Sequence, residues 1–217
     1  MGQKVNAQLI RTGPVYSWES RWFAQKGYNY LLLADFKIRK ALMEKLKFAG
    51  IARVEIDRSI NSLKITAFVS KPGMVIGRSG AGLEELKKFL QQLMVTLVKD
   101  KKQMPKLDIV VEPVKEPNLD AYLVAKMVSD QLVKRLPAKR VLNQAAERVM
   151  GAGAKGVRII LSGRIGGAEI GRREKIQKGT VPLSTIRALI TFASAPALTK
   201  KGYIGVKVWI HREEASK

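Results

Sequence analysis

The 217-residue sequence contains no cysteine and a single histidine, His211. Without cysteine the chain forms no disulfide, no thiolate metal site and no cysteine nucleophile. One histidine excludes a zinc site built on several histidines, and a histidine-based triad would need a residue close to the C-terminus. Catalysis would therefore depend on a carboxylate–metal cluster or a lysine nucleophile. We expect no catalytic residue and no metal site.

Long apolar runs are absent too. No stretch of about 18 consecutive apolar residues occurs, so we predict no transmembrane helix and no membrane partner. The first residues, MGQKVN, lack the apolar core of a signal peptide, and Asn6 stands where a myristoylation signal needs Ser or Thr. These features predict a soluble intracellular protein, expected in the cytoplasm, with an organelle as the alternative that stays open.

Acidic residues are few in comparison with basic ones. The chain has 40 Lys and Arg against 18 Asp and Glu, a formal net charge of +22. Like charges at this density repel one another in a compact state, and a polyanionic partner relieves the repulsion. Nucleic acid is the favoured partner, ahead of an anionic membrane. The alternative is a basic domain whose charge serves only solubility.

The first half of the chain predicts an arm and a small α+β domain. Residues 1–34 form the arm, in which basic side chains alternate with aromatic rings that either stack on bases or pack onto the chain's own domain. Residues 35–114 give the order helix, strand, strand, glycine-rich loop, helix, strand. The first helix is expected over Asp35–Ala49, with Asp35 as its N-cap and Phe36 on its apolar face.

The second half predicts another α+β domain over residues 117–211, followed by a short tail at 212–217. A helix of about twenty residues begins at Pro117, and a second helix follows over Ala138–Met150. Four segments with strand patterning then come in succession, joined by Gly- or Pro-containing turns. Two helices packed on a four-stranded, mostly antiparallel sheet are the expected architecture.

Three glycine patterns in the sequence resemble phosphate-binding fingerprints. The spacing of Gly77 and Gly82 fits a P-loop, but the required Lys and Ser/Thr are missing, so no nucleotide cofactor is expected. The stretch GAGAKG at 151–156 follows a helix and precedes a strand, the reverse of a Rossmann turn. That leaves the four residues Gly77, Arg78, Ser79 and Gly80, a G-x-x-G loop between two helices.

A G-x-x-G loop in this order of elements is the RNA clamp of a KH domain. Glycine lets an RNA backbone approach closely, and the arginine adds a guanidinium that forks onto phosphate oxygens. The extra helix and strand on the N-terminal side are those of the type II, or prokaryotic, KH domain. The fold class is therefore α+β, with a type II KH domain followed by the C-terminal α+β domain.

Sequence blocks along nearly the whole chain resemble one known family. They include MGQKVN at the start, KPGMVIGRSG at the glycine loop, SGRIGGAEI at 162–170 and IGVKVWI near the end. On these blocks the chain resembles the bacterial-type small-subunit ribosomal protein S3 family. The resemblance implies a structural protein of the small-subunit head, with small-subunit ribosomal RNA, mRNA and neighbouring head proteins as partners.

The resemblance also implies a role at the pore through which mRNA enters the ribosome. A basic cluster at the start of the second C-terminal helix faces incoming mRNA in that family and assists unwinding of its hairpins; here it comprises Lys134, Arg135, Lys139 and Arg140. Asn143 and Gln144 stand where the family carries further basic residues, and the stretch at 99–106 is longer than expected. The candidates for ribosomal RNA contact are Gln3, Lys4, Arg11, Arg21, Trp22, Arg164, Arg172 and Arg173.

Two alternatives stand beside the ribosomal interpretation. A free KH-type regulator of mRNA or small RNA would have the same glycine loop and charge, but it would not need the long C-terminal domain. An enzyme acting on nucleic acid would need a carboxylate cluster, whereas residues such as Glu84 and Glu85 are typical of a helix surface.

Overall fold

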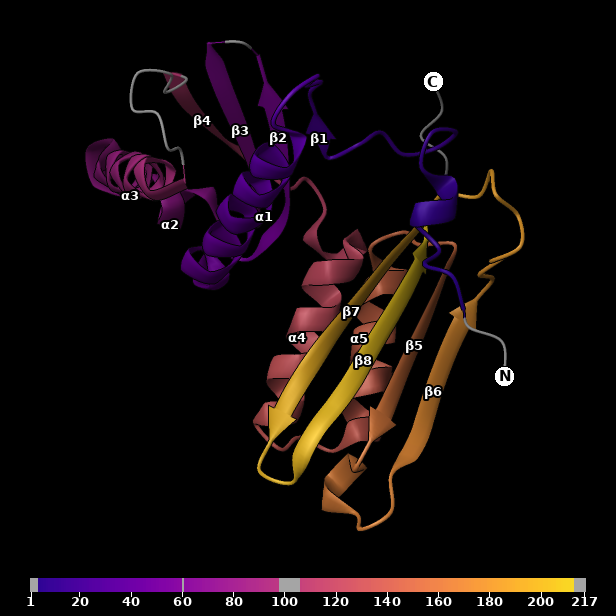
Figure 1. The fold of residues 1–217 in the computed structure, drawn as a ribbon. Coiled ribbons are helices and arrows are strands. Elements are labelled where there is room, and N and C mark those ends of the chain that lie inside the picture. The colour runs from indigo at the N-terminus through magenta and orange to yellow at the C-terminus, as the bar shows by residue number, and fades with distance from the viewer. Residues whose placement is uncertain (1–3, 60, 98–105, 213–217) are drawn as a thin grey trace. The chain divides into compact units, whose positions relative to one another are not determined.

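The computed structural model describes residues 4–59, 61–97 and 106–212 (Figure 1). The chain divides into two compact units. The first unit is Trp18–Lys115, and the second combines Met1–Ser17 with Glu116–Lys217. The predicted arm of residues 1–34 is thus shared between the units, because residues 4–17 pack onto the C-terminal sequence and residues 18–34 belong to the first unit. The stretch at 99–105, Gln3 and residues 213–217 lie outside the described residues.

The first unit is a four-stranded mixed sheet with helices (Figure 1). Its strand order is β1-β2-β3-β4; β2 and β3 are antiparallel, and the two outer pairs are parallel. The order of the elements confirms the predicted KH domain. The elements are β1 Ser20–Arg21, α1 Tyr28–Lys45, η2 Lys47–Ala49, β2 Ile51–Arg58, β3 Ser62–Val69, α2 Pro72–Ile76, η3 Arg78–Gly80, α3 Ala81–Leu97 and β4 Lys106–Pro113.

Helix α1 begins seven residues earlier than predicted, so the expectation for Asp35 was wrong. Its N-cap is Gly27, which has a left-handed backbone, and Asp35 lies inside the helix, 4% exposed. The Asp35 carboxylate accepts hydrogen bonds from Trp22 Nε1 at 2.7 Å and from Arg58 Nε at 2.7 Å. The apolar face is also shifted, because Ile38 is fully buried whereas Phe36 is 64% exposed.

The second unit confirms the predicted C-terminal fold. Its sheet has the order β6-β5-β8-β7, and all three neighbouring pairs are antiparallel. Both helices lie on the same face of this sheet (Figure 1). The elements are η1 Leu9–Arg11, η5 Pro117–Leu119, α4 Ala121–Val133, α5 Ala138–Gly151, β5 Gly156–Gly163, η6 Ile165–Gly167, β6 Arg172–Gly179, β7 Ile190–Thr199 and β8 Gly202–His211.

The first helix of the second unit is shorter than the predicted twenty residues. The segment Pro117–Leu119 forms a separate 3-10 turn, and α4 starts only at Ala121. Asp120 sets this start, because its Oδ1 accepts hydrogen bonds from the backbone N–H groups of Tyr122 (2.9 Å) and Leu123 (3.1 Å). Helix α5 begins at the predicted Ala138.

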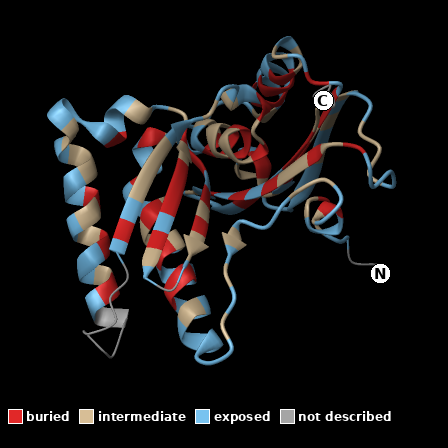
Figure 2. Cartoon of the chain, turned by 90° about the horizontal axis from the view of Figure 1, so that it is seen from above, coloured by how far each residue is buried: buried red, intermediate tan, exposed pale blue. Residues whose placement is uncertain are grey.

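Each unit has an apolar core of its own. Buried and exposed residues alternate along β2 and most of β7 (Figure 2). In β5 and β8 the alternation is interrupted, because Ile160 and Trp209 are also buried, in a smaller cluster with Ala7 and Ile190. Among the described residues, no helix is long and apolar enough to span a membrane. The same part of the chain contains no group of three or more His, Asp or Glu side chains placed to hold a metal ion.

Candidate nucleic-acid interface

The G-x-x-G loop is an exposed turn between α2 and α3. Gly77 has φ +70° and Gly80 has φ +81°, conformations that glycine adopts at little cost. Ser79 also has a left-handed backbone, with φ 53° and ψ 23°. The side chains of Arg78 and Ser79 are exposed. The turn thus presents a guanidinium and a hydroxyl on a backbone that glycine keeps open.

The position of this turn depends on a glycine outside the four-residue motif. A Cβ on Gly82 would lie 2.5 Å from the carbonyl oxygen of Val75 and 3.1 Å from that of Ile76. The first turn of α3 therefore packs directly on the backbone of α2. In the sequence, Gly82 stands out only as part of an incomplete P-loop pattern, which does not predict this close contact.

An acidic side chain near the turn is neutralised by a cation from α1. Lys45 Nζ donates a hydrogen bond to Glu85 Oε1 at 2.9 Å, and both groups are solvent-accessible. This hydrogen bond and the charge of Lys45 lower the pKa of Glu85 from its ordinary value. The ion pair reduces the repulsion that Glu85 would exert on a phosphate at the neighbouring loop.

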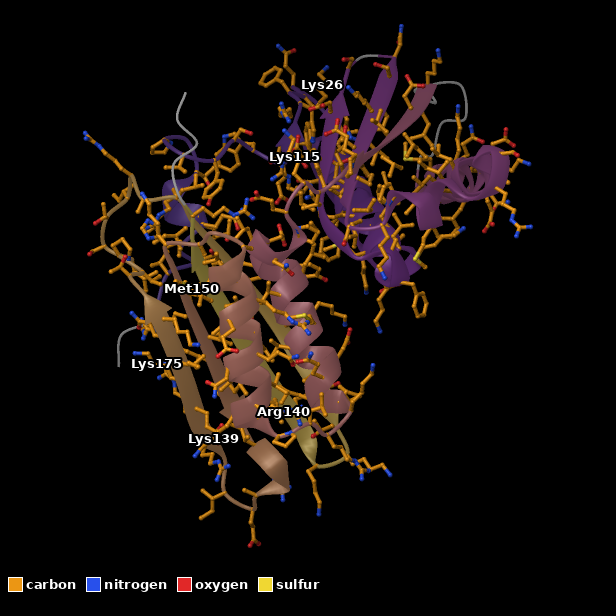
Figure 3. The ribbon with its side chains drawn as sticks, turned by 180° about the vertical axis from the view of Figure 1, so that it is seen from behind. Lys26, Lys115, Lys139, Arg140, Met150 and Lys175 are labelled. Atoms are coloured by element: carbon orange, nitrogen blue, oxygen red, sulfur yellow. The ribbon has the colours of Figure 1, made fainter. Side chains whose placement is uncertain are left out.

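The predicted basic cluster surrounds the turn from α4 to α5. Lys134 is the C-cap of α4, and Lys139 and Arg140 lie in the first turn of α5 (Figure 3). These side chains and that of Arg135 are exposed. The N-cap of α5 is Pro137, which provides no side-chain cap, and the first helical turn contains no acidic residue. The positive end of the helix dipole therefore adds to the charge of the cluster.

The sheet of the second unit carries a basic face that the sequence analysis missed. In β5–β8, one set of alternate residues packs on the helices, and the other set forms the opposite face. That outer face includes exposed Arg173, Lys175 and Lys207, together with half-buried Arg158. The outward-facing positions of β5–β8 hold no Asp or Glu, since Glu174 of β6 lies opposite Leu161 on the side of the helices. This basic face can be predicted from the sequence, because alternate residues of a strand point to opposite faces and the basic residues fall on the same alternate positions.

Comparison with known proteins identifies the family. A model of the ribosomal protein S3 C-terminal domain matches residues 128–210, and a KH domain model matches residues 37–119. The chain is 45% identical to small ribosomal subunit protein uS3 of Desulfitobacterium hafniense over 214 residues, 99% of this chain and 94% of the relative. It is 46% identical to uS3 of Bacillus cytotoxicus, again over 99% of this chain and 94% of the relative. It is 44% identical to uS3 of Desulfosudis oleivorans over 100% of this chain and 97% of the relative.

The chain belongs to the uS3 family of small ribosomal subunit proteins. This confirms the resemblance noted in the sequence, and it excludes the enzyme alternative, because the uS3 family consists of structural ribosomal proteins. A KH domain in a protein of this family implies binding to ribosomal RNA. A free KH-type regulator does not account for the match to the S3 C-terminal domain.

One predicted RNA-contacting residue of this uS3 chain has a different role in the structure. Arg11 is 0% exposed. Its guanidinium donates hydrogen bonds to five backbone carbonyl oxygens, at 2.7–3.3 Å, those of Ala7, Pro182, Leu183, Thr185 and Ala188. Arg11 therefore fastens the N-terminal segment to the loop before β7, and its buried side chain forms no part of an exposed surface. No local pattern in the sequence indicates this role, because four of the acceptors lie 171–177 residues away.

The other candidates of the N-terminal region differ in their availability. Lys4 is exposed. Arg21 forms ion pairs with Glu55 and Asp57 at the edge of the first unit, and its side chain remains 52% exposed. Trp22 is half-buried and donates its indole N–H to Asp35.

The three candidates of the second unit occupy three different environments. Arg164 donates to the carbonyl oxygens of Ala168 at 2.8 Å and of Lys201 at 3.4 Å. Arg172 pairs with Glu174 at 3.0 Å and stays 59% exposed. Arg173 belongs to the basic outer face of the sheet. Arg164 is thus the most engaged in contacts within the unit, Arg172 is paired but largely exposed, and Arg173 is the most accessible to RNA.

Proposed function

We propose that this uS3-family chain is a structural constituent of the small-subunit head that helps form the pore through which mRNA enters the ribosome. It would bind small-subunit ribosomal RNA and neighbouring head proteins in the cytoplasm, and it would contact incoming mRNA and assist its unwinding. The mRNA contact rests on one observation, the four exposed cations around the uncapped start of α5.

The cluster is suited to a single RNA strand. Lys139 and Arg140 come from the first turn of a 14-residue helix whose inner face is fully packed, so their backbone positions are rigid. Cations held beside a phosphate backbone release condensed counterions, and this release supplies affinity without regard to sequence. A fixed positive surface that fits one strand stabilises the unpaired form of RNA in preference to the wider duplex.

No reaction of this chain drives the movement of mRNA. The P-loop pattern fails at Leu83 and Glu84, which stand where Lys and Ser/Thr are required. We therefore assign translocation energy to other ribosomal components and a passive role to this chain. Asn143 and Gln144, exposed on α5, leave the mRNA surface with two fewer cations than the family usually has.

Two further surfaces would serve ribosomal RNA. The exposed G-x-x-G loop of Gly77–Gly80 offers a KH-type clamp on the first unit. The basic outer face of the second unit offers the exposed cations Arg173, Lys175 and Lys207 to a phosphate backbone. These surfaces account for a net charge of +22 that the fold itself does not need.

Sucrose-gradient fractionation of a lysate in magnesium tests the assignment. We expect the chain to co-sediment with small subunits and whole ribosomes, and to leave those fractions after ribonuclease treatment. Sedimentation as free protein, or with light RNA only, would contradict the ribosomal function and favour an independent KH-type RNA partner.

A further inference from the structure

A cavity of about 880 Å³ lies at one end of the second unit. Its walls come from three connections, which are the turn between α4 and α5, the η6 loop after β5, and the turn between β7 and β8. The start of β6 completes the wall. The size falls within the range of pockets that enclose small organic ligands, roughly 300–1,000 Å³.

The interior of the cavity is apolar. Leu132, Ile165 and Ile204 line it and are 6%, 2% and 3% exposed, so they belong equally to the core of the unit. Leu136 and Leu198 also line it, but they are 41% and 60% exposed. Large apolar side chains open to water at a concave site are what a flat apolar ligand group would cover.

The lining is also strongly positive. Arg135, Lys139, Lys200 and Lys201 contribute exposed cations, whereas Glu174 is the one acidic residue of the lining and is paired with Arg172. The cavity therefore combines an apolar interior with several cations and little negative charge.

The cavity wall is held in place before any ligand binds. Arg164 ties the η6 loop to the β7–β8 turn, because its guanidinium bonds the carbonyl oxygens of Ala168 and Lys201. Arg135 has φ 62°, a left-handed conformation that is uncommon for residues other than glycine. Such backbone conformations are concentrated at ligand-binding sites.

We propose that this cavity binds one unpaired nucleotide of an RNA strand, with the base in the apolar interior and the phosphate against Arg135, Lys139 and the lysines of the β7–β8 turn. The proposal rests on the proposed function, because Lys139 belongs both to the mRNA cluster and to the cavity lining. A nucleotide is favoured over an acidic peptide, because a nucleotide joins the flat aromatic faces of a base to a phosphate, and these match the apolar side chains and the cations of the lining. A captured base would hold a melted strand open and would oppose re-pairing.

Photo-crosslinking of the full chain tests the proposal. The probe is a single-stranded 12-nucleotide RNA with one 4-thiouridine, and crosslinked peptides are mapped by mass spectrometry. We expect crosslinks within residues 132–139 and 198–204. The double variant Leu136→Ser with Leu198→Ser removes apolar lining without changing charge, so these crosslinks should fall at least about fivefold and affinity about three- to tenfold. Its salt dependence should stay that of the unmodified chain.

A matched control removes exposed apolar side chains elsewhere. Val95 is 43% exposed on α3 and Ile186 is 49% exposed before β7, and neither lines the cavity. Changing both to Ser should leave the crosslinks and the affinity unchanged. As a check that needs no variant, uridine monophosphate should suppress the cavity crosslinks of the unmodified chain at concentrations where ribose 5-phosphate does not. Equal competition by the two compounds would mean that the base is not recognised and would overturn the proposal.

The variant Lys139→Ala with Arg140→Ala separates this inference from the proposed function. Loss of two phosphate contacts should weaken RNA binding and make the salt slope about 1.4 less steep. Unchanged affinity and slope would contradict the mRNA contact at α5. A second outcome would overturn the nucleotide pocket and leave the mRNA contact standing. In that outcome, Lys139→Ala with Arg140→Ala lowers the RNA affinity and the salt slope, but Leu136→Ser with Leu198→Ser leaves the cavity crosslinks unaltered.

Discussion

Gly82 Cα lies so close to the Val75 carbonyl that a methyl group on it would come within 2.5 Å of the oxygen. The contact joins the first turn of α3 to the last turn of α2, and the G-x-x-G loop spans the gap between these two turns. The shape of the clamp is therefore set by a glycine that follows the motif as well as by the two glycines inside it.

Replacing Gly82 with Ala should displace α3 from α2 and distort the loop. We expect a loss of about 1–3 kcal/mol of stability in the first unit and weaker binding of single-stranded RNA. Hydrogen exchange resolved over residues 62–97 measures the first effect. Gly73→Ala is the control, since a Cβ there meets nothing within 4 Å and φ is not left-handed. Equal protection in the two variants would show that the close contact does not constrain the loop.

Replacing Arg78 and Ser79 together with Asp should weaken RNA binding while the fold is retained. Both side chains are exposed, so the change costs little packing, and the new carboxylates repel phosphate. Fluorescence anisotropy with a single-stranded RNA measures the effect. Lys37→Asp with Asn29→Asp makes the same change of charge on exposed positions of α1. If both double variants lose affinity equally, the effect is one of net charge and the clamp assignment fails.

Replacing Asp35 with Asn should destabilise the first unit by about 3–5 kcal/mol, because Arg58 is left buried without its counter-charge. The side chains of this pair are only 5% and 9% exposed. Differential scanning calorimetry should show the transition of the first unit lowered by roughly 10 °C or more. Asp57→Asn, at a carboxylate 39% exposed, should shift it little. Similar shifts for the two variants would argue against a stabilising role of the buried pair.

Replacing Arg11 with Ala should release the N-terminal segment from the second unit. Five carbonyl oxygens lose their donor, and we expect a cost of about 3–5 kcal/mol. Lys cannot restore the forked geometry, so Arg11→Lys should behave similarly. Limited proteolysis within residues 4–17 reports the release, and Arg21→Ala serves as the exposed control. Unchanged protection after Arg11→Ala would show that apolar contacts alone hold the segment.

Replacing Lys139 and Arg140 with Ala should slow translation through a stable mRNA hairpin without impairing subunit assembly. The exposed cations contribute nothing to the core, so the fold remains. Single-turnover translation of messages with and without the hairpin, on reconstituted ribosomes, gives the rate ratio. A ratio equal to that of the unmodified chain would remove the unwinding role from these two positions.

The order of the elements could be predicted because local patterns determine it. The alternation in β8 and the glycine loop before α3 identified both units without any long-range information. The boundary of α1 was missed for a physical reason, because Asp35 has the chemistry of an N-cap but is held inside the helix by Arg58, 23 residues away. A pattern read along the chain does not contain such a partner.

In the candidate site, too, the features that depend on local sequence could be predicted, and those that depend on distant residues could not. The exposed residues Arg78, Ser79, Lys139 and Arg140 were placed correctly on loops and helix starts, since flanking sequence defines those positions. Arg11 was misassigned, because a buried arginine that bonds backbone carbonyls looks in sequence like any exposed cation of a basic chain. The cavity between three distant turns has no counterpart in the linear sequence at all.

The hydrogen bonds of Arg11 also determine the order in which the two units can fold while the chain is being synthesised. The first unit is one continuous segment, so all of it has been made once Lys115 has been added, and it can fold while the rest of the chain is still being translated. The second unit needs the segment that was made first and carbonyl oxygens from residues 182–188 that are made near the end. Residues 4–17, which include the cations Lys4 and Arg11, therefore lack their packing partners until translation is nearly complete.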